Sequence, residues 1–221
     1  IRSYVMGDRG SNNEPANDSD IAQMKKLVHE AIDAGALGVS TSRVLGHRAM
    51  NGEPVPGTFA AEDELYGLGE ALRDAGSGVF ELAPAGADGQ DLVNAPKEME
   101  WMKRLSATIQ RPVTFALLQN ETEPSLWKQL LEESIEATEQ GSQCFPQVAG
   151  RPFGLLIGLQ THHAFAKRPT FINLAHLPHN ELVKQLKQSS IRNAILNEAD
   201  TDPNPEILFD GMSRMIQSML H

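Results

Sequence analysis

The stretch DIAQMKKLVHEAIDAGALGVST, residues 20–41, gives the first clear indication of the fold. Its first part carries apolar residues three and four positions apart, which places them on one helical face: Ile21, Met24, Leu27, Val28, Ala31 and Ile32. Ser19 or Asp18 is the expected N-cap of this helix, and Gly35 is its expected end. The run ALGVST that follows, residues 36–41, is typical of a short buried strand. A helix followed at once by a strand is the repeating unit of a parallel α/β sheet.

The same alternation recurs downstream. Further helices are expected at residues 62–75, 91–110 and 125–140, and further strands at residues 78–83, 112–118 and 143–149. Short apolar strands separated by amphipathic helices predict repeated βα units and a parallel sheet. We therefore expect an α/β fold that forms part of a TIM-type (β/α) barrel. A doubly wound sheet is the alternative.

The pattern changes after residue 151. GLLIGL at 154–159 fits either a strand or a helix, residues 161–180 indicate a long surface loop, and two or three helices follow. We expect residues 1–155 to form middle βα units of a barrel. Residues 156–221 are expected to form a mainly helical part that continues or covers it.

Composition limits the classes of function. Apolar residues make up 40% of the 221 and charged residues 22%, which is typical of a soluble globular protein. The net charge of −10 argues against a nucleic acid partner. No apolar run approaches the roughly 20 residues that a membrane span requires. A single cysteine, Cys144, excludes an internal disulfide framework and predicts a buried, inert thiol in a cytoplasmic protein.

Functional side chains of parallel α/β folds lie at the C-terminal ends of the strands. The polar residues at those places are the candidate substrate-binding residues: Ser40, Arg43, His47, Glu81, Gln119 and Arg151. Either Arg43 or Arg151 is expected to bind a substrate carboxylate through two parallel hydrogen bonds.

Four of these candidates also have a purely structural alternative. The hydroxyl of Ser40 would then satisfy backbone groups at a strand end, and His47 would be a structural histidine of a loop. Arg43 would be a solvated loop charge, and Glu81 would form half of a salt bridge.

The histidines of the second half do not form a metal-binding pattern. His162 and His163 are adjacent, so their side chains do not converge as residues four apart on a helix do. Pro178 disfavours a regular turn between His176 and His179. HExxH, Walker, GxGxxG and GxSxG elements are absent from the sequence. No metal ligand and no catalytic residue is therefore assigned in this chain.

Five elements occur in an order that resembles one known family. They are VMGDRG (5–10), EAIDAGALGVSTS (30–42), EPVPGTFAAEDEL (53–65), RPVTFALLQ (111–119) and FPQVAG (145–150). Over roughly residues 1–155 the sequence resembles the D-aminoacylase, or N-acyl-D-amino-acid deacylase, branch of the amidohydrolase superfamily.

The resemblance implies a (β/α)8 barrel with a small β-sandwich and hydrolysis of an N-acyl-D-amino acid by zinc-activated water. In that family the zinc ligands are an HxH pair on the first strand, a cysteine and one histidine on each of two middle strands. An aspartate on the last strand is the general base. Where the middle-strand histidines would align, this sequence has Leu82 or Ala83 and Leu117. The HxH strand and the last barrel strand would lie outside this chain.

The sequence begins with Ile1 and ends with His221. Such ends are not typical of a complete protein, so we expect a fragment of a longer polypeptide. The preferred hypothesis is a fragment of a metal-dependent amidohydrolase that hydrolyses a non-peptide C–N bond of a small N-acyl amino acid. This fragment alone would be inactive. The alternative is a non-catalytic α/β binding or scaffold domain derived from that barrel.

Two further expectations follow from the same comparison. The insertion LGHRAMNGE, residues 45–53, would enlarge the loop over the active-site face and shape substrate access. An incomplete barrel exposes sheet edges and apolar helix faces, which predicts self-association or binding of a partner chain.

Overall fold

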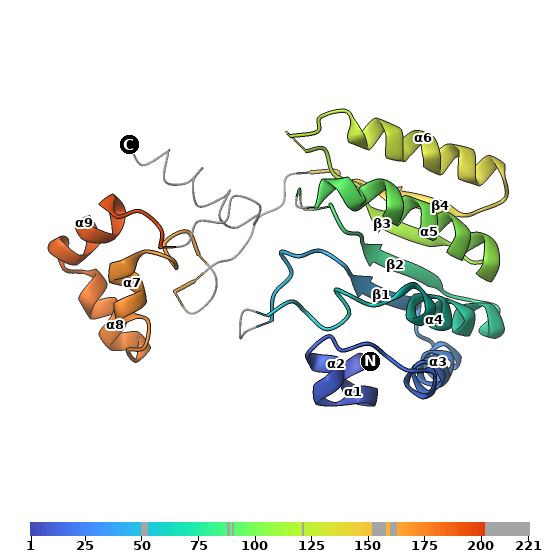
Figure 1. Ribbon diagram of the computed structural model, residues 1–221, viewed down its shortest axis with the longest axis horizontal. Coiled ribbons are helices and arrows are strands. Elements are labelled where there is room, and N and C mark those ends of the chain that lie inside the picture. The colour runs from blue at the N-terminus through green and yellow to red at the C-terminus, as the bar shows by residue number, and fades with distance from the viewer. Residues whose placement is uncertain are drawn as a thin grey trace. The chain divides into compact units, whose positions relative to one another are not determined.

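The chain forms two compact units, Ile1–Pro152 and Phe153–His221, in a computed structural model (Figure 1). The structure describes residues 1–49, 53–87, 89, 91–120, 122–151, 158–159 and 163–201. In the first unit the elements are α1 (Arg2–Met6), α2 (Asp8–Ser11), α3 (Asp18–Asp33), β1 (Gly38–Ser42), α4 (Glu62–Ala75), β2 (Val79–Ala83), the 3-10 helix η1 (Leu92–Asn94), α5 (Ala95–Ile109), β3 (Val113–Ala116), α6 (Leu126–Glu139) and β4 (Cys144–Gln147). In the second unit they are α7 (Pro169–Leu174), α8 (His179–Leu186) and α9 (Ser189–Asn197).

The four strands form one parallel sheet in the order β1-β2-β3-β4. Helices α4, α5 and α6 connect consecutive strands (Figure 1). This confirms the predicted βα units and the predicted parallel sheet. A doubly wound sheet reverses its strand order at a switch point. The strand order of the described sheet follows the order of the chain throughout, so these strands form a singly wound sheet.

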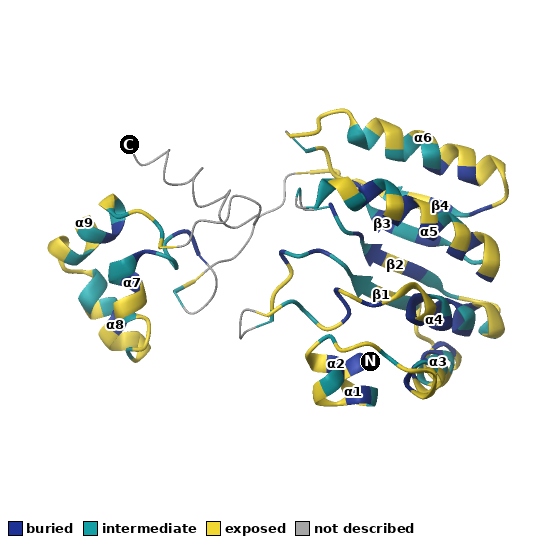
Figure 2. Cartoon of the chain, in the orientation of Figure 1, coloured by how far each residue is buried: buried dark blue, intermediate teal, exposed yellow. Residues whose placement is uncertain are grey.

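The two faces of the sheet differ because successive side chains of a strand point to opposite sides. Phe80, Leu82, Val113 and Phe115 are almost fully buried in the core that helices α3 to α6 form with the sheet (Figure 2). The alternate positions make up what we call the open face: Ser40, Ser42, Glu81, Ala83, Thr114, Ala116, Phe145 and Gln147. On this face Ser40, Glu81, Phe145 and Gln147 are exposed.

Helix α3 begins slightly earlier than the sequence predicts. Its N-cap is Asn17, whose side chain accepts a hydrogen bond of 3.0 Å from the backbone N–H of Asp20. The Asp20 carboxylate in turn accepts a hydrogen bond of 3.0 Å from the Asn17 N–H. This reciprocal pair is a capping box, so neither Ser19 nor Asp18 is the cap.

Glycine is required where β1 meets β2. A Cβ atom on Gly38 would lie 2.0 Å from the carbonyl oxygen of its strand partner Val79, far inside van der Waals contact. The absence of a side chain at Gly38 therefore lets the first residues of the two strands pair closely.

The short helices α1 and α2 were not expected from the sequence. Gly7 joins them with a positive φ of 60°, a backbone conformation that glycine adopts without a steric penalty. Each helix is too short to show a helical period of its own, which is why the motif VMGDRG gave no structural prediction.

The second unit also differs from the sequence prediction. Residues 161–180, expected as a long surface loop, contain α7 and the start of α8. Phe171, Leu182 and Ile195 form a small core between α7, α8 and α9. Of the uncertain segment GLLIGL, residues 154–157 lie outside the described residues, as do residues 202–221, where a further helix was expected.

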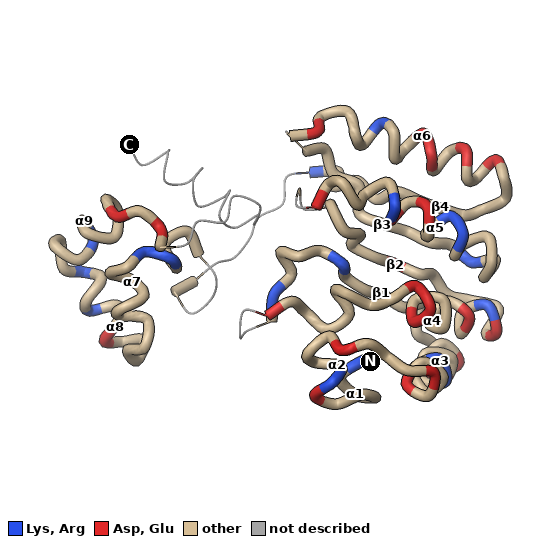
Figure 3. Tube along the Cα trace, viewed as in Figure 1, with Lys and Arg blue, Asp and Glu red and all other residues tan. Residues whose placement is uncertain are grey.

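Charged residues of the first unit lie mostly on its helices (Figure 3). Several of these side chains form ion pairs across neighbouring helices, such as Lys25 on α3 with Glu70 on α4 at 2.8 Å. Within the described ranges, none of the helices combines the length and the apolar composition that a membrane crossing requires.

Candidate functional site

A cavity of about 460 Å³ lies at the β1 side of the sheet, where open-face residues of β1 and β2 and residues of the helix-covered side, such as Val39 and Leu68, both line it. The N-terminal residues, the two strands, the loop after β1 and helix α4 all contribute to its walls. Its lining residues are Ile1, Arg2, Ser3, Val39, Ser40, Thr41, Ser42, His47, Val55, Pro56, Gly57, Glu64, Leu68, Glu81 and Ala83.

Ser40 and Glu81 form the polar floor of this cavity. They are register partners on β1 and β2, and the Ser40 hydroxyl donates a hydrogen bond to the Glu81 carboxylate. Glu81 lies in the middle of β2 and is exposed, not at a buried strand end. Among the described residues, no Lys or Arg side chain lies within ion-pair distance of its carboxylate. The structural salt bridge considered for Glu81 is therefore not found in this part of the chain.

His47 reaches the cavity from the loop between β1 and α4. Its Nδ1 atom lies 2.6 Å from the Ser42 hydroxyl oxygen. Its backbone carbonyl accepts a hydrogen bond of 3.1 Å from the Val55 N–H, and Arg48 and Pro54 form an antiparallel bridge next to it. The loop therefore folds back on itself, and this fold holds the imidazole at the end of β1.

Asn13 fixes the same loop to the N-terminal helices. Its side-chain amide donates to the carbonyl oxygens of Pro54 and Val55 at 3.1 and 3.2 Å, and its side-chain oxygen accepts from the Gly57 N–H at 2.8 Å. Asn13 has a left-handed backbone conformation with φ of 58°, which asparagine tolerates better than most residues. The Asn13 side chain thus holds residues 54–57 of the loop beside the cavity.

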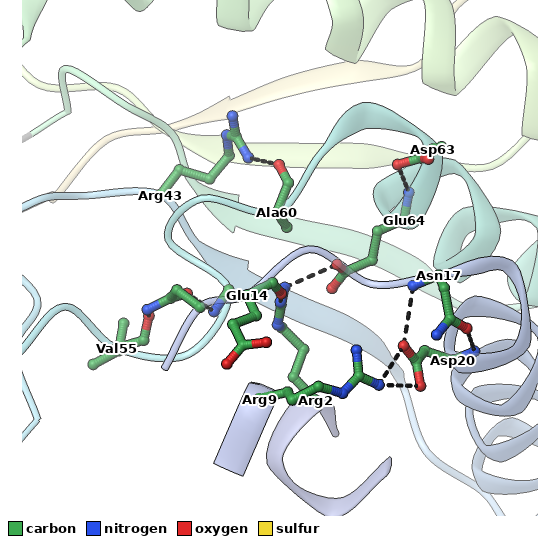
Figure 4. Close-up of polar contacts among 12 residues, drawn as sticks. Arg2, Arg9, Glu14, Asn17, Asp20, Arg43, Val55, Ala60, Asp63 and Glu64 are labelled. Carbon is green, nitrogen blue, oxygen red and sulfur yellow. Dashed lines mark hydrogen bonds and ion pairs between the residues drawn. The ribbon is translucent and has the colours of Figure 1, made fainter. Parts of the chain in front are cut away.

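Arg2 and Glu64 form a buried ion pair in the cavity wall (Figure 4). The Arg2 Nη1 atom lies 2.8 Å from a Glu64 carboxylate oxygen, and the residues are only 5% and 2% exposed. A second guanidinium nitrogen of Arg2 donates to the Glu14 carbonyl oxygen. Burial raises the pKa of Glu64, against the opposing effect of the nearby Arg2 charge. The positive charge of Arg2 is therefore matched within the protein.

Arg43 points away from the cavity and supports the fold. Its Nε atom lies 3.0 and 2.9 Å from the two carboxylate oxygens of Glu98 on α5. Its Nη1 donates to the Ala60 carbonyl oxygen at 2.6 Å (Figure 4). The guanidinium carbon lies 5.7 Å from the centroid of the Trp101 ring. These contacts tie the end of β1 to α5 and to the start of α4.

The structure brings three of the six predicted residues, Ser40, His47 and Glu81, to one cavity. Gln119 follows β3 and Arg151 follows β4; both are exposed, and neither lines this cavity. Binding of a substrate by any of the six stays a prediction.

Two wall residues, Arg2 and Glu64, were missed from the sequence. A signal for Glu64 exists: on α4 it precedes Leu68, Ala71 and Leu72 by four, seven and eight positions, so a charge falls on the apolar stripe of the helix. Such a charge needs a buried partner. Nothing comparable marks Arg2, because α1 is only five residues long.

The described residues do not fit a zinc site. The open-face positions at or near the strand ends are Ser42, Ala83, Ala116 and Gln147, none of which is a ligand that zinc prefers. Leu82 and Leu117 are buried apolar side chains. In the described part of the chain, no three His, Cys, Asp or Glu side chains gather closely enough to hold a metal ion.

Cys144 does not supply a zinc ligand either. It lies on the helix-covered face of β4, and burial raises the pKa of its thiol to about 11. The thiolate form that binds metals is therefore scarce at neutral pH.

Two solved structures resemble the fold. One is a D-aminoacylase whose structure is said to define a novel subset of amidohydrolases, and the other is a D-aminoacylase mutant in complex with copper chloride. Each aligns with a TM-score of 0.52 and 18% sequence identity over 68% of this chain. No protein-family profile and no curated protein matches the sequence.

The aligned part of this chain accounts for 28% of the length of each D-aminoacylase chain. A likeness at this level of identity shows the fold. The parallel sheet and its helices therefore have an amidohydrolase-like α/β fold.

Proposed function

We propose that the chain is a segment of an amidohydrolase barrel of the D-aminoacylase kind, and that the intact protein hydrolyses the amide bond of a small N-acylated amine or amino acid. The observation that carries this proposal is the cavity that includes Ser40, Ser42, Glu81 and Ala83 of the open face. In a closed barrel the open face would point inward. Ser42 and Ala83 end β1 and β2, so part of the cavity lies at the C-terminal strand ends, where such barrels bind their substrates.

Several contacts support a substrate-binding role for this wall. Ser40 and Glu81 present a hydroxyl and a carboxylate side by side, and the imidazole of His47 lies against Ser42 above them. These groups orient a polar ligand through hydrogen bonds, and the apolar side chains of Val39, Val55 and Leu68 line the rest of the cavity. The segment thus contributes binding and orientation.

The zinc that the resemblance implies would take its ligands from outside the described residues, because the strand-end positions here do not fit it. We assign no step of the reaction to a metal held by this chain. A second candidate function follows from the apolar residues Leu82 or Ala83 and Leu117, where the family's histidines would align: a barrel with apolar side chains in place of metal ligands would bind a ligand without cleaving it.

The experiment is amine release from a panel of N-acylated D- and L-amino acids and N-acylated amines by the natural full-length protein. Cleavage of any member supports the amidohydrolase proposal. Binding of panel members without cleavage, measured by calorimetry, supports the non-catalytic candidate. Stoichiometric zinc bound through His163 or His176 would contradict the proposed division of roles.

A further inference from the structure

We infer that the wall formed by β1 and β2 binds a positively charged group of the ligand, with Glu81 as its counter-ion. The inference rests on the proposed function for the kind of ligand, an N-acylated amine. It adds that the preferred ligand retains a second, protonated amino or guanidino group.

The charge of the cavity wall favours a cation. Its side chains of fixed charge are Arg2, Glu64 and Glu81. Arg2 and Glu64 neutralise each other through a contact of 2.8 Å. Among these three side chains, the carboxylate of Glu81 is the one left without a counter-charge.

The environment of the Glu81 carboxylate leaves room for a ligand donor. Glu81 receives one hydrogen bond, from the Ser40 hydroxyl, to its Oε2 atom. A carboxylate accepts several hydrogen bonds through its two oxygens. In the described part of the chain, Oε1 has no side-chain donor. A ligand ammonium placed there would gain both a hydrogen bond and an ion pair.

The two arginines that were expected to bind a substrate carboxylate, Arg43 and Arg151, lie outside the cavity. Arg43 is held by Glu98 and by the Ala60 carbonyl oxygen, and Arg151 lies beyond β4. Neither lines the cavity. The wall therefore offers a ligand carboxylate no uncommitted arginine, while it offers a ligand cation an exposed carboxylate.

The test is a matched pair of amides, N-acetyl-1,5-diaminopentane and N-acetylpentylamine, which differ by one ammonium group. The full-length protein is expected to show kcat/KM at least about tenfold higher for the diamine derivative, because one ion pair in a partly enclosed site favours the charged ligand by about this factor. In Glu81→Gln the preference should fall to within about twofold. The control Glu123→Gln, an exposed carboxylate before α6, should keep the preference.

Binding of the deacylated pair, 1,5-diaminopentane and pentylamine, is measured in parallel by calorimetry. If neither amide is cleaved, tighter binding of the diamine that is lost in Glu81→Gln still supports the inference, and only the proposed hydrolysis fails. Cleavage or binding without preference for the charged member would overturn the inference alone. A preference that persists in Glu81→Gln would overturn it as well.

Discussion

Arg2 and Glu64 form an ion pair of 2.8 Å between the first helix and the first turn of α4, and both side chains are almost fully buried. The pair joins two segments 62 residues apart in the sequence. It fixes the N-terminal helices beside the cavity and supplies part of the cavity wall. Breaking it therefore affects both the stability of the fold and the shape of the site.

Replacement of Glu64 by Leu should lower the free energy of unfolding by about 3 to 5 kcal/mol, because Arg2 is then buried without a counter-charge. The double replacement Arg2→Met and Glu64→Leu should recover most of this loss, since no unpaired charge remains. Urea unfolding of the two variants measures both effects. If the double variant were no more stable than Glu64→Leu, the ion pair would not be the cause.

Asn17→Ala should lower the free energy of unfolding by about 0.5 to 2 kcal/mol, because the backbone N–H of Asp20 loses its capping acceptor. The matched control is Ser125→Ala. Ser125 occupies the N-cap position of α6 without a side-chain capping hydrogen bond, and its loss should change stability by less than about 0.5 kcal/mol. Equal effects at the two caps would contradict the assigned capping box. Thermal or urea unfolding gives the comparison.

Asp20 should make stability depend on pH in acid. The hydrogen bond from the Asn17 backbone and the contact with Arg9 lower the pKa of Asp20 (Figure 4). A carboxylate with a lowered pKa stabilises the folded state above its unfolded pKa of about 4 and loses this contribution as pH falls through the folded pKa. The free energy of unfolding of the wild type should therefore exceed that of Asp20→Asn by a constant amount at neutral pH. The difference should shrink below about pH 4, and a difference that grows there would contradict the assignment.

Arg43→Lys should destabilise the fold by about 1.5 to 3 kcal/mol, because lysine cannot reproduce the contacts of the guanidinium with Glu98 and the Ala60 carbonyl. Arg151→Lys, at an exposed position, should change stability by less than about 0.5 kcal/mol. Unfolding curves of both variants measure their stability, and calorimetry measures their affinity for the ligand. The two measurements distinguish an effect on the fold from an effect on binding. If the Arg43→Lys protein kept its stability but bound ligand more weakly, Arg43 would be a ligand-binding residue and not a structural one.

The repeated helices and strands could be predicted from the sequence because the apolar residues of each recur with its own period. Helix α4 ends at Ala75 before Gly76, as expected, and its apolar stripe meets the strands it connects. Helices α1 and α2 are too short to show a period, and their place depends on contacts such as Arg2 with Glu64. Tertiary contacts of this kind leave little trace in the local sequence.

The site was predicted in part for a similar reason. The rule that function lies at strand ends selected Ser40, Glu81 and His47, which do share a cavity, although Ser40 and Glu81 lie in the middle of their strands. The same rule also selected Arg43, whose side chain turns toward Glu98. The direction of a long side chain after a strand depends on which partner lies near it, and Glu98 is 55 residues away in the sequence.

If the cavity beside β1 and β2 is the ligand site of an amide-hydrolysing protein, loss of the His47 imidazole should impair catalysis. The test compares kcat/KM for the best amide substrate of the full-length protein between His47→Ala and His176→Ala, the latter at an exposed histidine between α7 and α8. We expect a loss of at least about tenfold for His47→Ala and no change for His176→Ala. Equal values for the two variants, or no cleavage of any amide, would contradict this expectation.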